Sequence, residues 1–109
     1  MIILYGIPTC DTCRAARKAL EDAGKSVVFR DVRAEPLDAE TLARFHATLG
    51  DGLINRRSTT WRGLSEDARA GDPVALLAAH PTLMKRPVIE ANGTLTLGWD
   101  AKSKAVHLG

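Results

Sequence analysis

Hydrophobic and polar positions alternate between strand-like and helix-like periods along the first third of the chain. The apolar run Met1–Tyr5 predicts a strand, and a turn rich in Gly and Pro follows it. From about Asp11 the apolar positions recur at helical intervals, which predicts a helix that ends near Gly24. A second apolar run, Val27–Val32, completes a β-α-β unit. We expect its two strands to be parallel and joined by a right-handed crossover.

The middle of the chain has mainly helical patterns. Asp38 is a good N-cap for a helix that ends at Gly50, and Asp72 followed by proline predicts another helix, which stops before Pro81. The intervening segment is irregular. We expect a loop or cap at 58–60 and the start of a short helix at Ser65.

The last third predicts a β-hairpin. Asn92-Gly93 separate two strand-like runs, 85–91 and 94–98, and Asn-Gly between such runs is the strongest short hairpin signal. A short helix is expected from about Asp100. The order of the elements predicts an α/β fold with a mixed sheet, and the absence of repeats and linkers predicts a single domain over 1–109.

Composition and charge exclude some classes of function. The chain has 109 residues, 45% of them hydrophobic, which is enough for one core. The net charge is only +2, and Lys and Arg occur in pairs rather than tracts, so we expect no direct nucleic-acid binding. No stretch approaches the roughly 20 apolar residues of a membrane span, and no secretion signal is evident. We therefore expect no membrane association and a cytoplasmic protein.

The chain has two cysteines, Cys10 and Cys13, where the first strand gives way to the first helix. Unpaired N–H groups and the positive dipole at a helix N-terminus stabilise the thiolate of Cys10. Positions i and i+3 share a helix face, so Cys13 can resolve a mixed disulfide on Cys10. A structural disulfide is the alternative interpretation of the pair. It would close a very small loop, however, and would therefore constrain the unfolded chain little. A zinc site needs about four ligands, and no second cysteine pair or close pair of histidines supplies them, so we expect no metal.

A C-x-x-C pair at the first strand-to-helix junction of a mixed sheet is the layout of a thioredoxin-like fold. In that fold a cis-proline precedes the third strand and packs beside the cysteines, and Pro87 is the natural candidate. The remaining residues have simpler interpretations. We expect surface or helix-end positions for the three histidines, and packing or cleft-wall positions for Trp61 and Trp99.

Four segments resemble the arsenate reductase (ArsC)-related family, including its YffB-like and Spx-like branches: Leu4–Cys13, Asn55–Arg62, Met84–Val88 and Leu97–Trp99. The resemblance runs essentially end to end. The arginine-containing blocks resemble the YffB-like branch most, whereas the cysteine pair resembles the Spx-like branch. The resemblance implies a thioredoxin-like mixed sheet with a helical segment, roughly 36–81, inserted between the second and third strands.

In the arsenate reductases of that family, a cysteine attacks arsenate while arginines hold the oxyanion. By this resemblance, Cys10 matches the nucleophile and Arg86 matches one arginine. The position of the second arginine is Asn55 here, followed by two arginines, and the position of the third is Trp99. Loss of one charge-assisted ligand weakens oxyanion binding by roughly one to two orders of magnitude. We therefore do not expect robust arsenate reduction.

The sequence thus predicts an oxidoreductase that uses thiol-disulfide exchange, acts on a small thiol or oxyanion and has no bound cofactor. An external thiol such as glutathione is the expected reductant. A redox-sensing, Spx-like transcriptional regulator that binds the RNA polymerase alpha subunit is the alternative. We expect a monomer. The predicted catalytic residues are Cys10, Cys13 and Arg86, and the predicted substrate-binding residues are Arg14, Arg56, Arg57 and Pro87.

Overall fold

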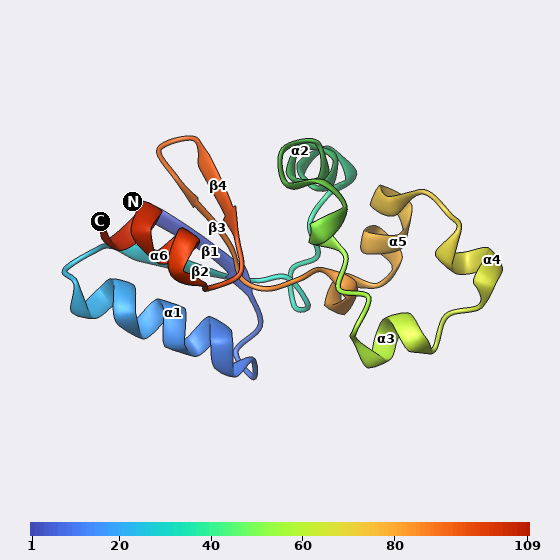
Figure 1. The fold of residues 1–109 in the computed structure, drawn as a ribbon, viewed down its shortest axis with the longest axis horizontal. Coiled ribbons are helices and arrows are strands. Elements are labelled where there is room, and N and C mark those ends of the chain that lie inside the picture. The colour runs from blue at the N-terminus through green and yellow to red at the C-terminus, as the bar shows by residue number, and fades with distance from the viewer. The chain divides into compact units, whose positions relative to one another are not determined.

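The computed structural model describes residues 1–109 and contains a four-stranded sheet with strand order β2-β1-β3-β4 (Figure 1). Strands β1 (Ile2–Gly6) and β2 (Val27–Asp31) are parallel and are connected by helix α1 (Asp11–Asp22). Strand β3 (Val88–Ala91) runs antiparallel to both β1 and β4 (Thr94–Leu97). The predicted β-α-β unit and the predicted hairpin are both confirmed.

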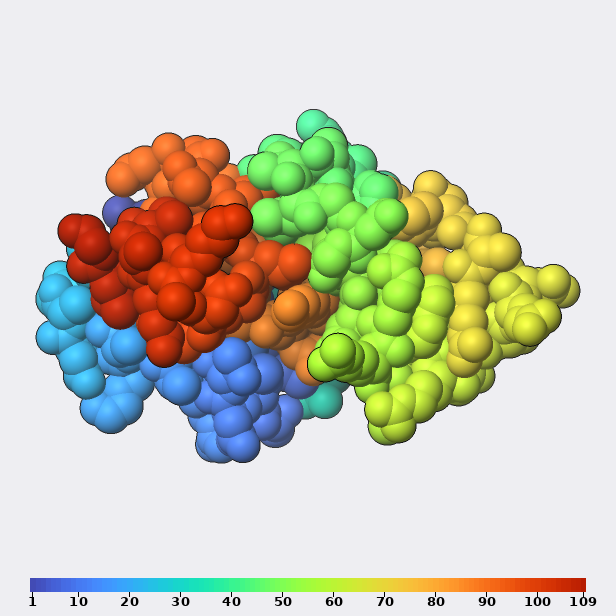
Figure 2. Space-filling view, in the orientation of Figure 1, coloured from blue at the N-terminus to red at the C-terminus, as the bar shows by residue number.

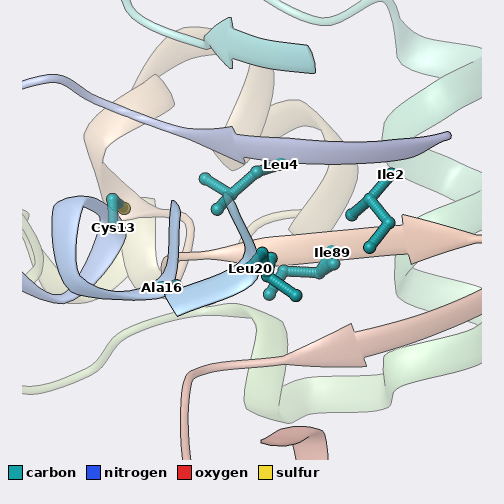
Figure 3. Close-up of a cluster of buried hydrophobic side chains, with 6 residues drawn as sticks. All are labelled: Ile2, Leu4, Cys13, Ala16, Leu20 and Ile89. Carbon is teal, nitrogen blue, oxygen red and sulfur yellow. The ribbon is translucent and has the colours of Figure 1, made fainter. Parts of the chain in front are cut away.

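Alternate strand residues carry apolar side chains to the face of the sheet that α1 covers. Leu4 of β1 lies opposite Ile89 of β3, and both are fully buried. Because side chains alternate between the two faces of a strand, the same face also receives Ile2. These side chains form one buried cluster with residues of α1 (Figure 3), and its members are Ile2, Leu4, Cys13, Ala16, Leu20 and Ile89. One of the two cysteines is therefore part of the core.

Helix α6 (Ala101–Leu108) covers the same face of the sheet. The Asp100 carboxylate accepts a hydrogen bond from the Ser103 backbone N–H, and the Ser103 hydroxyl interacts with the Asp100 backbone, which makes a capping box. His107 Nε2 lies 2.7 Å from Thr96 Oγ1 on β4, and Thr96 is the strand partner of Ile89. Figure 2 shows α6, in red, beside the orange β3–β4 hairpin.

The histidines take helix-end positions, as expected, and one of them is also buried. All three histidines lie at or near helix ends, but His107 is buried, with only 4% of its surface exposed. Its burial depends on contacts with β4, which local sequence does not reveal.

Contacts within the chain divide it into two compact units, which are Met1–Glu35 with Arg86–Gly109, and Pro36–Lys85. The second unit lies between β2 and β3 in sequence, and the expected insert, 36–81, falls inside it. The second unit consists of helices α2 (Ala39–Leu49), α3 (Thr59–Arg62), α4 (Glu66–Arg69) and α5 (Pro73–Ala79), with short 3-10 turns at Gly50–Leu53 and Pro81–Leu83.

The helices of the second unit begin where the sequence supplies capping side chains. Asp38 accepts a hydrogen bond from the Thr41 backbone N–H at the start of α2, and Asp72 does the same for Ala75 at the start of α5. Serine caps also begin the two four-residue helices of the irregular segment. A four-residue helix is about one turn long, which is too short to show a repeating apolar pattern in the sequence.

The architecture is a thioredoxin-like mixed sheet with a helical segment inserted between the second and third strands. None of the helices is both long enough and apolar enough to span a membrane.

Candidate functional site

Cys10 occupies the N-cap of α1, as the sequence predicts. A tight turn leads from β1 to the helix, in which the Cys10 backbone N–H donates to the Ile7 carbonyl over 3.1 Å. Cys10 has extended backbone angles, and its carbonyl accepts the first helical hydrogen bond, from Arg14 N–H over 3.0 Å. The thiol is therefore carried at the end of the helix where unpaired N–H groups and the positive dipole favour an anion.

Cys13 lies one helical turn later and is enclosed in the core. It is fully buried, whereas Cys10 is only partly buried and packs against the edge of the same cluster. Figure 3 shows Cys13 on the face of α1 that is turned toward the sheet. Both cysteines are free thiols in this structure. One thiol is thus accessible to a reactant, and the other is shielded behind it.

Gly6, the last residue of β1, leaves the space that Cys13 occupies. A Cβ atom at position 6 would overlap with Cys13 Sγ. The side chain of residue 6 must therefore be a hydrogen atom if Cys13 is to reach the core. The sequence motif contains Gly6, but only the three-dimensional contact between strand and helix reveals this role.

The surroundings of Cys10 favour its ionised form. Partial burial alone would raise the pKa of the Cys10 thiol, but interactions with the backbone N–H and thiol of Cys13 and with the Arg86 guanidinium outweigh it. The pKa of Cys10 is consequently lowered from the ordinary value of 9.0. Since the thiolate is the nucleophilic form of cysteine, Cys10 is the more reactive thiol.

The surroundings of Cys13 have the opposite effect. Burial, together with the neighbouring Cys10 thiolate, raises the pKa of Cys13 to about 12, against weaker opposing contributions from Ile7 and Arg86. At neutral pH, Cys13 therefore remains protonated while Cys10 carries the larger thiolate fraction.

Arg86 reaches the cysteines because of the sheet topology. Tyr5 of β1 pairs with Val88 of β3 in antiparallel register, so the end of β1 and the start of β3 lie at the same edge of the sheet. Arg86 comes just before β3, and its charge acts on both thiols. The Arg86–Pro87 peptide bond is cis, as expected, and the Pro87 carbonyl accepts a hydrogen bond from the Gly98 backbone N–H over 2.8 Å.

The other predicted ligands have different partners. Arg14 is exposed on α1 and forms an ion pair with Asp11. Arg56 and Arg57 belong to the second unit, and both are exposed. Arg56 donates to the Asp51 carbonyl over 3.0 Å and stacks over the Trp61 ring. The structure therefore brings together Cys10, Cys13 and Arg86, while substrate binding by the other arginines stays a prediction. No group of three or more His, Cys, Asp or Glu side chains is arranged to hold a metal ion.

Comparison with known proteins identifies the family. The sequence model of the ArsC family matches residues 5–105. The chain belongs to the ArsC family. An uncharacterised protein of Haemophilus influenzae is 38% identical over 94% of both chains. The global transcriptional regulator Spx of Bacillus subtilis is 31% identical and aligns with 92% of this chain and 81% of the regulator.

Solved structures of ArsC-family proteins have the same fold. A YffB protein superimposes over the whole of both chains with a TM-score of 0.91 and 34% identity. An ArsC-related protein of Brucella melitensis, 44% identical, has a TM-score of 0.75 over 95% of this chain and 92% of its own. The relatives thus include both arsenate reductase-related proteins and Spx regulators, as the sequence motifs predict.

The first testable prediction concerns Arg86. In Arg86→Gln, loss of the guanidinium should raise the pKa of Cys10 and slow its alkylation by iodoacetamide near neutral pH by about tenfold. The wild-type rate should rise with pH through a midpoint below 9.0, and the midpoint of the variant should be higher. The measurement is the pH profile of the alkylation rate, with the modified residue identified by peptide mass mapping.

Arg33→Gln is the matched control, because it removes an exposed guanidinium of the same unit that does not influence Cys10. Equal slowing in both variants, or an unshifted midpoint in Arg86→Gln, would show that Arg86 does not stabilise the thiolate.

The second prediction concerns Gly6. In Gly6→Ala the new methyl group must displace Cys13, and such overpacking costs about 1–3 kcal/mol of unfolding free energy. Urea unfolding measures this loss. Gly63→Ala is the control, because its added Cβ would meet nothing closer than 3.5 Å. Equal stability of the two variants would contradict the tight contact.

Proposed function

We propose that the chain is a thiol-disulfide oxidoreductase in which Cys10 is the nucleophile and Cys13 is the resolving thiol. The observation that carries this proposal is the difference between two thiols one helical turn apart. The pKa of the accessible Cys10 is lowered, whereas burial and Cys10 raise the pKa of Cys13 to about 12. This difference sets the order of reaction, because Cys10 is the thiol that is both accessible and more readily ionised and therefore attacks first.

The first step is attack of the Cys10 thiolate on a disulfide sulfur of the substrate. The Cys10 sulfur forms a mixed disulfide with one half of the substrate, and the other half leaves as a thiolate. Arg86 stabilises the attacking anion before this step. The helix dipole acts in the same direction.

The second step is attack of Cys13 on the Cys10 sulfur. Once Cys10 is in a mixed disulfide, it no longer carries the negative charge that helps to raise the pKa of Cys13. Ionisation of Cys13 therefore becomes easier at the moment when its thiolate is needed. The Cys13 thiolate displaces the second half of the substrate as a thiolate, and a Cys10–Cys13 disulfide forms.

Two equivalents of an external thiol, such as glutathione, then return the pair to the reduced state and leave as glutathione disulfide. The cycle needs no resident cofactor, because all the electrons pass through sulfur. Small thiols and their disulfides are the substrate class that this chemistry favours.

Arsenate is a weaker candidate substrate. Trp99 takes the position of one family arginine, and its indole is half-buried against the core beneath Lys104, whose Nζ lies 5.9 Å from the ring. An indole N–H cannot replace the planar charged fork of arginine, which binds oxyanions through two hydrogen bonds.

The third prediction tests the order of the two cysteines. When reduced protein is mixed with glutathione disulfide, Cys13→Ser should accumulate a mixed disulfide at Cys10, because no resolving thiol is present. The wild type should instead form an intramolecular disulfide that dithiothreitol reverses. Acid trapping of free thiols followed by intact-mass measurement distinguishes these species.

Cys10→Ser is the matched control and should form little mixed disulfide, since Cys13 is buried and protonated. If the wild type never forms a reversible Cys10–Cys13 disulfide, the dithiol cycle is wrong and single-cysteine chemistry takes its place.

A redox-responsive regulator is the second candidate function. Its support is the 31% identity to a global transcriptional regulator, which covers 92% of this chain. In this role the same disulfide would act as a sensor, and the partner would be the alpha subunit of RNA polymerase. The modest net charge of +2 is compatible with a protein partner and no DNA contact.

The fourth prediction separates these two functions. If the chain is an oxidoreductase, the immobilised C-terminal domain of the polymerase alpha subunit should retain neither the reduced nor the oxidised protein. Retention of one redox state only, with loss of this difference in Cys10→Ser, would favour the regulator.

A further inference from the structure

A pocket of about 290 Å³ lies in the first unit, at the opposite end of β1 from the cysteines. The start of β1, the turn before β2, the β3–β4 turn and the end of α6 surround it. Cys10 follows the far end of β1, and a five-residue strand spans about 16 Å. Both chain termini lie at the pocket end of the sheet (Figure 1). The pocket is therefore separate from the redox site.

The pocket has a positive character. Its ionisable side chains are Lys25 and His107, of which Lys25 supplies the positive charge, and no carboxylate belongs to its lining. Ser26 and Asn92 add a hydroxyl and a carboxamide, which can donate hydrogen bonds. Burial and, after it, the charge of Lys25 lower the pKa of His107, so His107 is neutral at neutral pH and Lys25 is the cation of the lining. This lining favours an anion.

His107 leaves one polar atom of the wall without a partner. Its Nε2 interacts with Thr96, but its buried Nδ1 has no hydrogen-bond partner. Buried polar atoms in folded proteins are nearly always paired, so the unpaired Nδ1 is unusual.

The rim of the pocket is apolar. Met1 and Val106 line it, and they are 78% and 50% exposed, among the few large hydrophobic side chains that the fold leaves in solvent. Exposed apolar side chains beside polar donors suit a ligand with two chemically different ends.

We propose that this pocket binds a small organic anion, in which a carboxylate or phosphate group is attached to a short apolar chain. Lys25, Ser26 and Asn92 bind the anionic group, and Met1 and Val106 contact the apolar chain. The volume suits a ligand of roughly the size of a six-carbon acid, which lies near the lower limit for small-molecule pockets.

Titrations of ¹⁵N-labelled full-length protein test this proposal. Hexanoate or hexyl phosphate should give saturable amide shifts at residues 25–26, 92 and 106–107. The ligand with the lower dissociation constant shows whether the pocket prefers a carboxylate or a phosphate group. Acetate and inorganic phosphate should bind more weakly because they lack the chain. Hexylamine, which has the chain and the opposite charge, should not bind. Failure of both hexyl anions to shift these residues, or equal binding of hexylamine, would overturn the proposal.

Two variants with exposed substitutions make the test specific. Lys25→Gln should weaken binding of the tighter anion at least about tenfold, and Val106→Asp should weaken it by a similar factor through charge repulsion. Lys18→Gln is the matched control, since Lys18 lies outside the pocket and pairs with Asp22. Unchanged affinity in Lys25→Gln, or equal loss in Lys18→Gln, would refute the site.

A last measurement separates the pocket from the redox chemistry. Saturating anion should leave the alkylation rate of Cys10 unchanged, because the two sites lie at opposite ends of the sheet. Competition between the anion and iodoacetamide, with shifts confined to the start of α1, would place binding at the cysteines and overturn the proposal.

Discussion

The contact between Gly6 and Cys13 determines how the first helix meets the first strand. Because position 6 has no side chain, Cys13 Sγ can lie directly against the end of β1. This contact fixes the first turn of α1 on the sheet and leaves Cys10, three residues earlier, at the open end of the helix. The cysteine pair is thus positioned by the same packing that closes the core, rather than by a separate loop.

Burial also explains why two chemically identical thiols differ in reactivity. Cys13 loses contact with water completely, and desolvation is the largest contribution to its raised pKa. Cys10 is also partly desolvated, but the interactions with Cys13 and Arg86 exceed this penalty. Each thiol influences the other, so a change in the state of Cys10 alters the ionisation of Cys13. The two thiols therefore titrate as a coupled pair.

Local sequence signals predict most of the elements and much of the candidate site. Asp38, Asp72 and Asn92-Gly93 act through neighbours within a few residues, so their capping and turn roles can be inferred without tertiary structure. Burial of His107 and the fit of Gly6 depend on residues distant in sequence or on a strand-to-helix contact. The positive pocket likewise combines four separate segments, and no periodicity or motif connects them.

The sheet topology accounts for the positions of the cysteine pair and of the pocket in the first unit. Because β3 is antiparallel to β1, the start of β3 lies beside the end of β1, and this brings Arg86 to the cysteines. The same pairing places the end of β3 beside the start of β1, where Ala91 lies opposite Ile2. The β3–β4 turn and the Lys25 segment meet at that second edge. One strand pairing therefore places the cysteines and Arg86 at one end of the sheet and the pocket that contains Lys25 at the other.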